Sequence, residues 1–480
     1  MTDKNSSAPL SVWARNVHEP FLRAALLIAL TTGFGYGAIM VALLAFGITG
    51  TWYPALLQAH GHAQLFGWLG LFVLGMGLFF LPRLRGMQLK HQGRLRIVFA
   101  LLVAGIVLRT VAQPLAAWFN AEFLRALFLF AAFLEMAGML LLGSIFFATE
   151  RAAKPLSVHA PAYPVQIFLQ LAFISFVLAV TLNLFGAWNA FAQGRNVMAA
   201  RYAQSSIVLM LYGVAIPMAI VFSLRNLPLF LRLAMPSPRG WRALALVYMT
   251  ALFLRVLPQL IDIADDALVL TGRVLSANAL NMIVFDALAV GGILVMNACI
   301  LIFVWRLDLL RRRPPWTGER APNTRPDLEH LRQPTRERYP DNGEYGRFEL
   351  LIYAAFAWLV VAVLLDVLRA LPFVAENFTI PQDLARHALM VGFITLLIFG
   401  MAVRMAPGFS QKRGVAYPDM VMWLFMLGNA AAFLRVVPAF FPESNFALML
   451  WGLSGFIGWC AVLVLTVMLW ETFRVQPPRA

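Results

Sequence analysis

Three histidines lie at the start of long apolar runs, and their chemistry suits metal binding. His60 and His62 occur in the stretch HGHAQLFGW, and His387 occurs in RHALMVGF. His62 and His387 share the pattern His-Ala-x-x-x-Gly-aromatic. Neutral imidazole is a good ligand for haem iron, and two opposed imidazoles fill both axial positions. The repeated pair therefore predicts that His62 and His387 bind one haem, and without a CxxCH motif the haem is expected to be a non-covalent haem b.

An alternative stays open for each histidine, because an intramembrane imidazole can simply hydrogen-bond a neighbouring helix or lie among lipid headgroups. His60 precedes His62 by two positions, and residues two apart on a helix point about 200° from each other. His60 is therefore expected to lie in the preceding loop, to be exposed, or to serve a second metal, for which copper is the candidate. The remaining histidines are expected to be solvated, namely His18, His91, His159 and His330.

Other polar residues in apolar runs are candidates to support such a site. Arg109, Arg255 and Arg435 lie near the ends of three apolar runs, and a guanidinium group binds carboxylates well. Snorkelling toward the interface is the alternative for these arginines, and it is favoured for Arg255. Glu135 and Asp286 are intramembrane carboxyls, which are either functional or hydrogen-bonded to a neighbouring helix.

The composition is that of an integral membrane protein. Of the 480 residues, 61% are hydrophobic and only 13% are charged, whereas soluble domains are about 45–50% apolar and about 25% charged. The net charge of +15 does not indicate nucleic-acid binding, because the basic residues are not gathered into an aromatic-interleaved patch. Cys299 and Cys460 lie in apolar segments without metal-binding spacing and are expected to be packing residues. The start of the chain does not resemble a cleavable signal sequence, because its first apolar run is too long.

Runs of about 20 apolar residues can cross a bilayer, and the sequence contains twelve. They are approximately 21–48, 60–81, 95–115, 121–148, 164–190, 202–224, 241–261, 278–306, 348–371, 384–406, 418–440 and 445–471. One side of this topology carries 29 Lys and Arg residues and the other carries 9. The positive-inside rule then predicts that both termini are cytoplasmic, including the segment 1–20. The basic, proline-rich loop 307–347 is expected to be a flexible cytoplasmic connection.

An internal repeat organises these spans into three units of four. The aligned residues of spans 2 and 10 are Gly67 with Gly392, Gly75 with Gly400, and Pro82 with Pro407. The motifs LRTVAQPL, LRVLPQL and LRVVPAF follow in the first, second and third unit. The expected fold is an all-α domain over 21–472, with pseudo-symmetric units at about 21–148, 164–306 and 348–472. Within it, His62 and His387 are expected at equal depth near the outer face.

These features resemble the haem-copper oxidase and nitric-oxide-reductase superfamily, and within it the chain is most similar to the NnrS-like proteins. The resemblance implies a fold like subunit I of the oxidases and a haem- and copper-containing protein of the nitric oxide response. It also implies that His62 and His387 are the low-spin haem ligands and that Arg435 lies near a haem propionate. The oxidases hold copper with histidines on spans 6 and 7, which contain none here, so an oxidase-type copper centre is not expected.

The expected function is that of a bacterial inner-membrane protein that handles or senses nitric oxide, or transfers electrons, during nitrosative stress. A respiratory electron-transfer protein is the expected partner besides the lipid bilayer. A haem-less transporter is the main alternative, because twelve spans and internal repeats also suit carriers. An assembly partner of a respiratory complex is another, and whether the protein is an enzyme stays open.

Overall fold

The protein is an all-helical bundle in the computed structural model, which describes residues 16–157, 163–231, 236–269, 279–309, 342–371, 374, 380–441 and 444–474. Twelve of its helices are long and apolar enough to cross a membrane, which confirms the predicted fold class and number of spans. Most of the loop 307–347 and of the segment 1–20 lies outside the described residues.

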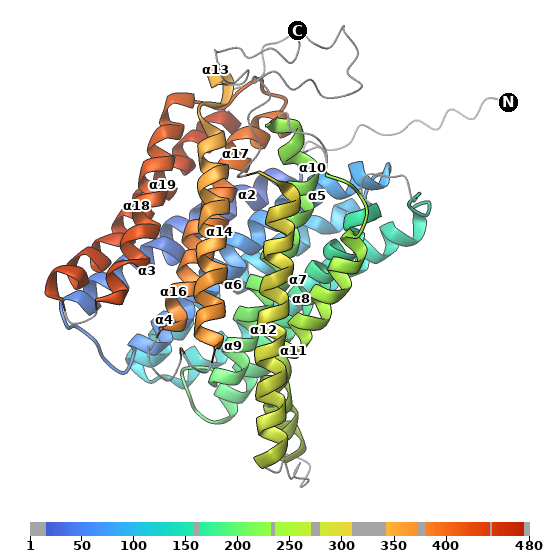
Figure 1. The fold of residues 1–480 in the computed structure, drawn as a ribbon. Coiled ribbons are helices and arrows are strands. Elements are labelled where there is room, and N and C mark those ends of the chain that lie inside the picture. Colours follow the sequence, from blue (N-terminus) through green and yellow to red (C-terminus); the bar gives the residue numbers. More distant parts are fainter. Residues whose placement is uncertain are drawn as a thin grey trace, which may run out of the picture.

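The spans run in chain order as labelled in Figure 1. They are α2 and α3 (His18–Ile28, Phe34–Ala45), α4 and α5 (Tyr53–His62, Leu71–Arg85), α6 (Leu95–Phe119), α7 (Glu122–Ala152), α8 (Gln166–Ala192), α9 and α10 (Ala200–Val208, Ile216–Phe230), α11 (Trp241–Val269), α12 (Ala279–Leu307), α14 (Phe348–Ala370), α16 and α17 (Gln382–His387, Leu396–Phe409), α18 (Val421–Val436) and α19 (Asn445–Arg474). The short helix α13 (Asn342–Tyr345) precedes α14.

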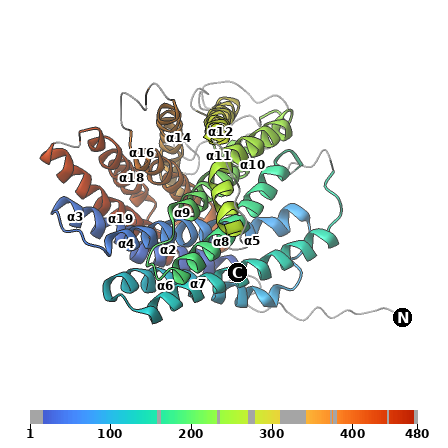
Figure 2. The ribbon, with the colours of Figure 1, turned by 90° about the horizontal axis from the view of Figure 1, so that it is seen from below.

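Helices that follow one another in the chain pack side by side, as in α6 with α7, α11 with α12 and α18 with α19. The last helix, α19, packs along α3 of the first span. The bundle therefore closes on itself, and red and blue helices lie side by side in Figure 2.

Spans 2, 6 and 10, which the repeat places in equivalent positions, each change from α-helix to π-helix in mid-span. The π-helical segments of these three spans are η2 (Ala63–Gly70), η5 (Leu209–Ala215) and η9 (Ala388–Thr395), and span 1 contains a shorter one, η1 (Ala29–Gly33). The first and third begin directly after His62 and His387, respectively. π-Helical turns are rare and frequently accompany functional sites.

One glycine in each π-helical segment of spans 2, 6 and 10 lies against the preceding span. A Cβ atom added there would lie 2.4 Å from Ile28 at Gly67, 2.5 Å from Ser175 at Gly213 and 2.6 Å from Trp358 at Gly392. A larger side chain at these positions would force the helices apart, since packed interiors leave no room for an extra methyl group. The same close approach in all three units supports the three-unit repeat that the sequence predicts.

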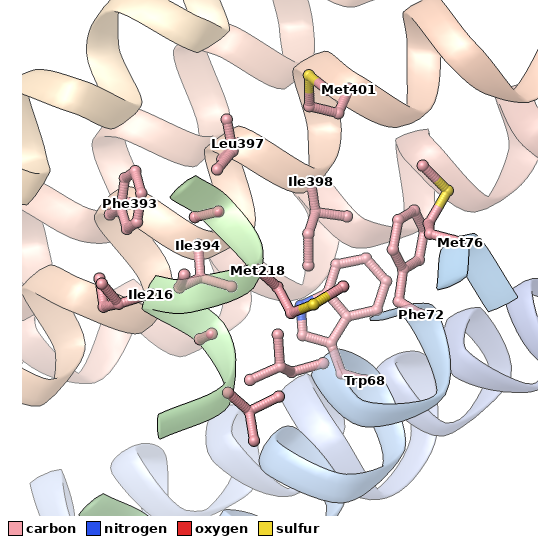
Figure 3. Close-up of a cluster of buried hydrophobic side chains, with 14 of the residues drawn as sticks. Trp68, Phe72, Met76, Ile216, Met218, Phe393, Ile394, Leu397, Ile398 and Met401 are labelled. Carbon is pink, nitrogen blue, oxygen red and sulfur yellow. The ribbon is translucent and has the colours of Figure 1, made fainter. Parts of the chain in front are cut away.

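Hydrophobic side chains fill the centre of the bundle, where spans 2, 6 and 10 meet. Figure 3 shows Trp68 and Phe72 of span 2 facing Met218 of span 6 and Ile398 of span 10. Trp68 is completely buried. These apolar contacts hold spans 2 and 10 in place, and both spans carry histidines.

His18 differs from its prediction. It was expected to be solvated, but only 2% of it is exposed, and its ring packs edge-on against Phe79 and Phe409. The apolar face of α2 continues to its first residue, so the imidazole is carried into the core. His91 is exposed, as predicted, whereas His159 and His330 lie outside the described residues.

Candidate functional site

One cavity of about 710 Å³ is lined by five of the residues that the sequence singles out: His60, His62, His387, Arg109 and Arg435. Spans 1, 2, 3, 5, 6, 10, 11 and 12 contribute to its wall. Pockets of this size commonly hold cofactors and other small molecules. We call it the histidine cavity.

His60 lies inside α4, so the expectation that it belongs to a loop is wrong. The expectation of surface exposure is also wrong, because the ring lines the cavity and its Nδ1 lies 2.9 Å from the carbonyl oxygen of Gly33 in span 1. A carbonyl oxygen only accepts hydrogen bonds, so Nδ1 carries the proton and donates it. Nε2 then keeps its lone pair, and it makes no hydrogen bond within the described residues.

His387 closes α16 and is held in a similar way. Its Nδ1 lies 2.9 Å from the carbonyl oxygen of Asp383 and 3.0 Å from the Oδ1 atom of the same residue. Both partners are acceptors when the carboxyl is ionised, so Nδ1 is again the donor and Nε2 keeps its lone pair. A hydrogen bond that fixes the tautomer through one ring nitrogen is typical of histidines that bind a metal through the other.

His62 is engaged differently, because its Nε2 lies 2.8 Å from Oε1 of Glu135 on α7. The two side chains are only 1% and 2% exposed. The ring stacks on Phe66 with centroids 4.5 Å apart, and Nδ1 is buried without a hydrogen-bond partner in the described part of the chain. Glu135 therefore makes the interhelical hydrogen bond that the sequence left as one of two alternatives. Asp286, by contrast, is exposed on α12.

Hydrogen bonds link the polar residues of the cavity in separate groups. Asp383 accepts from His387 and from Arg435, whereas Nε2 of His62 is bonded to Glu135. His60, which is bonded to Gly33 through Nδ1, keeps Nε2 free as His387 does, and His62 does not. Sequence repetition aligned His62 with His387, but similarity between repeats does not determine which way a ring turns.

Arg435 and Arg109 both carry hydrogen-bond donors that remain unused in the described residues. Arg435 donates from Nη2 to Oδ2 of Asp383 at 3.0 Å and lies 4.0 Å from the ring centroid of Trp451. Arg109 is 1% exposed and contacts the sulfur of Met198 through Nη2 at 3.6 Å. In both side chains Nε and Nη1 are buried without a partner. Buried donors of this kind are expected to be satisfied by a bound group.

Arg255 does not snorkel, and the interfacial role favoured for it is wrong. Its guanidinium group is 5% exposed and pairs with both carboxylate oxygens of Asp366 on α14, at 2.6 and 3.0 Å. Asn297 of α12 donates a further hydrogen bond to Asp366 at 2.9 Å. Sequence reasoning missed Asp366, although an acidic residue far from the start of an apolar span was a usable signal. The network joins α11, α12 and α14 and lies outside the histidine cavity.

Residues 346–475, which comprise α14 and the spans that follow it, match the family model of the NnrS protein. This stretch contains His387, Asp383 and Arg435. The last part of the chain is therefore similar to the NnrS protein. No curated protein matches the chain.

The chain also has the fold of a solved oxidase. It is similar, with a TM-score of 0.68 and 12% sequence identity, to a structure described as "Cryo-EM structure of a heme-copper terminal oxidase dimer provides insights into its catalytic mechanism". The match covers 98% of this chain and 86% of the oxidase chain. The predicted architecture of the haem-copper oxidases is thereby confirmed.

The cavity is not a ready-made site for a protein-bound metal ion. The described residues hold no group of three or more His, Cys, Asp or Glu side chains that could bind a metal ion together. Cys299 is buried and Cys460 half-buried, and neither forms a disulfide. What the cavity offers is two imidazoles with free Nε2 atoms, one from span 2 and one from span 10, together with two buried guanidinium groups.

Proposed function

We propose that the protein is a haem-binding membrane protein of the bacterial nitric oxide response and that one haem b lies between His60 and His387. The observation that carries this proposal is the shared state of the two rings. Each donates from Nδ1 to a backbone carbonyl at 2.9 Å and keeps Nε2 free beside the same cavity. Two imidazoles that each keep Nε2 free are the ligands that bis-imidazole binding of haem iron requires.

The rest of the cavity suits the same group. Its volume of about 710 Å³ lies within the range of about 300–1,000 Å³ for ligand pockets. Gly61 lines it, and a Cβ atom added to Gly61 would meet nothing within 4 Å. The unpartnered donors of Arg435 and Arg109 are suited to carboxylates such as haem propionates. The histidines would hold the iron, and the arginines would orient the propionates.

A haem in this position supplies one-electron redox chemistry and affinity for diatomic gases. His60 and His387, fixed through Nδ1, would hold the iron. Electron transfer, or sensing of nitric oxide, then has more support than rapid catalytic turnover. Copper has less support, because the described residues lack a cluster of three metal-binding side chains.

The family match and the oxidase-like fold support this function over a transporter. Carriers usually place polar binding groups near the bilayer midplane, whereas the meeting point of spans 2, 6 and 10 is apolar (Figure 3). The inner membrane as the location, and a respiratory protein as electron-transfer partner, belong to the same proposal.

Purification from membranes and reduced-minus-oxidised absorption spectroscopy test the proposal. We expect stoichiometric, non-covalent haem with a low-spin spectrum that changes when nitric oxide is added under anaerobic conditions. If the protein contains no haem, even after reconstitution with hemin, the proposal is refuted and the transporter or assembly role becomes preferable.

A further inference from the structure

A second cavity, of about 370 Å³, lies between spans 2, 4, 5 and 6. It is lined by the second halves of spans 2, 4 and 6 and by the beginning of span 5, so it occupies the end of the bundle opposite to the histidines. Most of its wall is hydrophobic and includes Gly77, Phe176 and Phe222. We call it the lower cavity, after the cytoplasmic side on which the charge distribution is expected to place it; α5 and α10, which line it, lie in the upper part of Figure 1.

Polar side chains gather where the lower cavity reaches the ends of its helices. Arg85 forms an ion pair with Glu150 at 3.0 Å. Arg225 also lines the cavity, and no acidic side chain of the described chain lies within ion-pair distance of it. Its neighbour Asn226 is 5% exposed, and its Nδ2 is buried without a hydrogen-bond partner in the described residues. This end therefore offers an uncompensated positive charge and an unused donor.

The lower cavity faces the bilayer along span 5. Ile174, one of its lining residues, is 53% exposed, and Gln170, one turn earlier, is also exposed. A molecule that enters here comes from the membrane. Basic pockets between transmembrane helices on the cytoplasmic side are characteristic sites for anionic lipid headgroups.

We propose that the lower cavity binds one anionic phospholipid. Its phosphate accepts hydrogen bonds from Arg225 and Asn226, and one acyl chain fills the apolar interior. This occupant accounts for both ends of the cavity, since the headgroup neutralises Arg225 and satisfies the amide of Asn226 while the chain meets only hydrophobic side chains. Free inorganic phosphate would leave the apolar interior unfilled.

The acyl chain would end close to the histidine cavity. Phe176 lines the lower cavity, and its ring lies 5.9 Å from that of Phe66. Phe66 lines the histidine cavity and stacks on His62 at 4.5 Å. The lipid would therefore support the aromatic wall between the two cavities, although its binding does not depend on haem.

A cavity-filling substitution tests the proposal without removing a polar group. A Cβ atom added to Gly77 would meet nothing within 4 Å, so Gly77→Leu places a side chain in space that the acyl chain needs. Gly291, on α12 and outside the cavity, also has nothing within 4 Å of an added Cβ. Gly291→Leu is the matched control for helix propensity and hydrophobicity.

Native mass spectrometry of the full chain in mild detergent measures the bound lipid, with added phosphatidylglycerol and phosphatidylcholine as probes. The parent and Gly291→Leu should retain one phosphatidylglycerol, and Gly77→Leu should lose it while keeping the parent's elution volume and thermal midpoint. Arg225→Gln should weaken retention about fivefold, because one basic residue contributes about 1 kcal/mol to anionic lipid binding. Millimolar inorganic phosphate should not displace the lipid.

Three results would overturn the proposal: equal retention in Gly77→Leu and the parent, equal retention of phosphatidylcholine and phosphatidylglycerol by the parent, or displacement by inorganic phosphate. If Gly77→Leu fails to fold, Gly77→Ala and Arg225→Gln keep the test intact. Both should then still reduce retention relative to Gly291→Ala.

Discussion

His60 and His387 are oriented by equivalent hydrogen bonds, although they lie on different spans and in different repeat units. In each ring Nδ1 lies 2.9 Å from a backbone carbonyl oxygen, that of Gly33 for His60 and that of Asp383 for His387. Both rings are therefore the same tautomer with the same free nitrogen. Two imidazoles prepared alike beside one cavity are better explained by a shared ligand than by independent packing.

Removing either of these rings should remove the haem. His60→Ala and His387→Ala are expected to insert into the membrane but to lose the low-spin spectrum, because each lacks one axial ligand. His62→Ala should retain haem, since its Nε2 is bound to Glu135. Haem content and difference spectra of the three purified variants show which histidines bind the haem. The reverse pattern, with loss in His62→Ala and retention in His60→Ala, would restore the pairing that the sequence motif predicts.

Glu135 should contribute to stability through His62. Glu135→Leu leaves the buried imidazole without its partner, which is expected to cost about 1–3 kcal/mol in free energy of unfolding. Glu135→Gln keeps an oxygen acceptor at the same place and should lose less. Glu122 is an exposed carboxyl of the same helix, and Glu122→Gln should stay within about 0.5 kcal/mol of the parent. Thermal unfolding in detergent ranks the stabilities of these variants. Equal stability of Glu135→Leu and the parent would show that Glu135 does not stabilise the fold through His62.

Arg435 should matter for haem affinity more than for folding. Arg435→Gln removes a charged donor beside the cavity, and a hydrogen bond to a charged group contributes about 1.5–3 kcal/mol. Haem should therefore bind about 10- to 100-fold more weakly. Arg474→Gln, at the other end of the bundle and 66% exposed, should leave affinity unchanged. Hemin titration of the apoproteins measures the haem affinity of both variants and of the parent. Equal affinities of Arg435→Gln and the parent would exclude a propionate contact.

The orientation in the membrane is predicted from charge alone. The side with 29 basic residues is expected to be cytoplasmic. Reporter fusions at residue 325 and at the C-terminus should both report the cytoplasm. A periplasmic signal at either position would reverse the orientation of the histidine cavity.

The sequence predicted the fold well because its information is periodic and redundant. Twelve apolar runs of sufficient length specify twelve spans, and the repeated glycines at 67 and 392 mark the close approach of neighbouring helices. The histidine cavity was also predictable in part, since the three selected histidines and two of the three selected arginines line it. The hydrogen-bond partners of His60 and His62 were not predictable. Gly33 contributes only a backbone carbonyl, and Glu135 is 73 residues from His62 in the chain.

The pairing of Arg255 was not predicted for a related reason. Asp366 stands out as an acidic residue within an apolar span, but it lies 111 residues from Arg255 in the chain, so the sequence does not show that the two meet.

The buried pair of Arg255 and Asp366 leads to the strongest stability prediction. Asp366→Ala leaves a guanidinium group that is 5% exposed without its counter-ion, and breaking a buried pair in this way costs about 3–5 kcal/mol. Arg255→Met combined with Asp366→Leu removes both charges and should recover most of that loss. Arg369 approaches Asp366 only to 3.7 Å and is 27% exposed, so Arg369→Gln should cost less than about 1 kcal/mol. Thermal unfolding of the four purified proteins tests this order. If the single Asp366→Ala variant is as stable as Arg369→Gln, the pair does not hold α11 against α14.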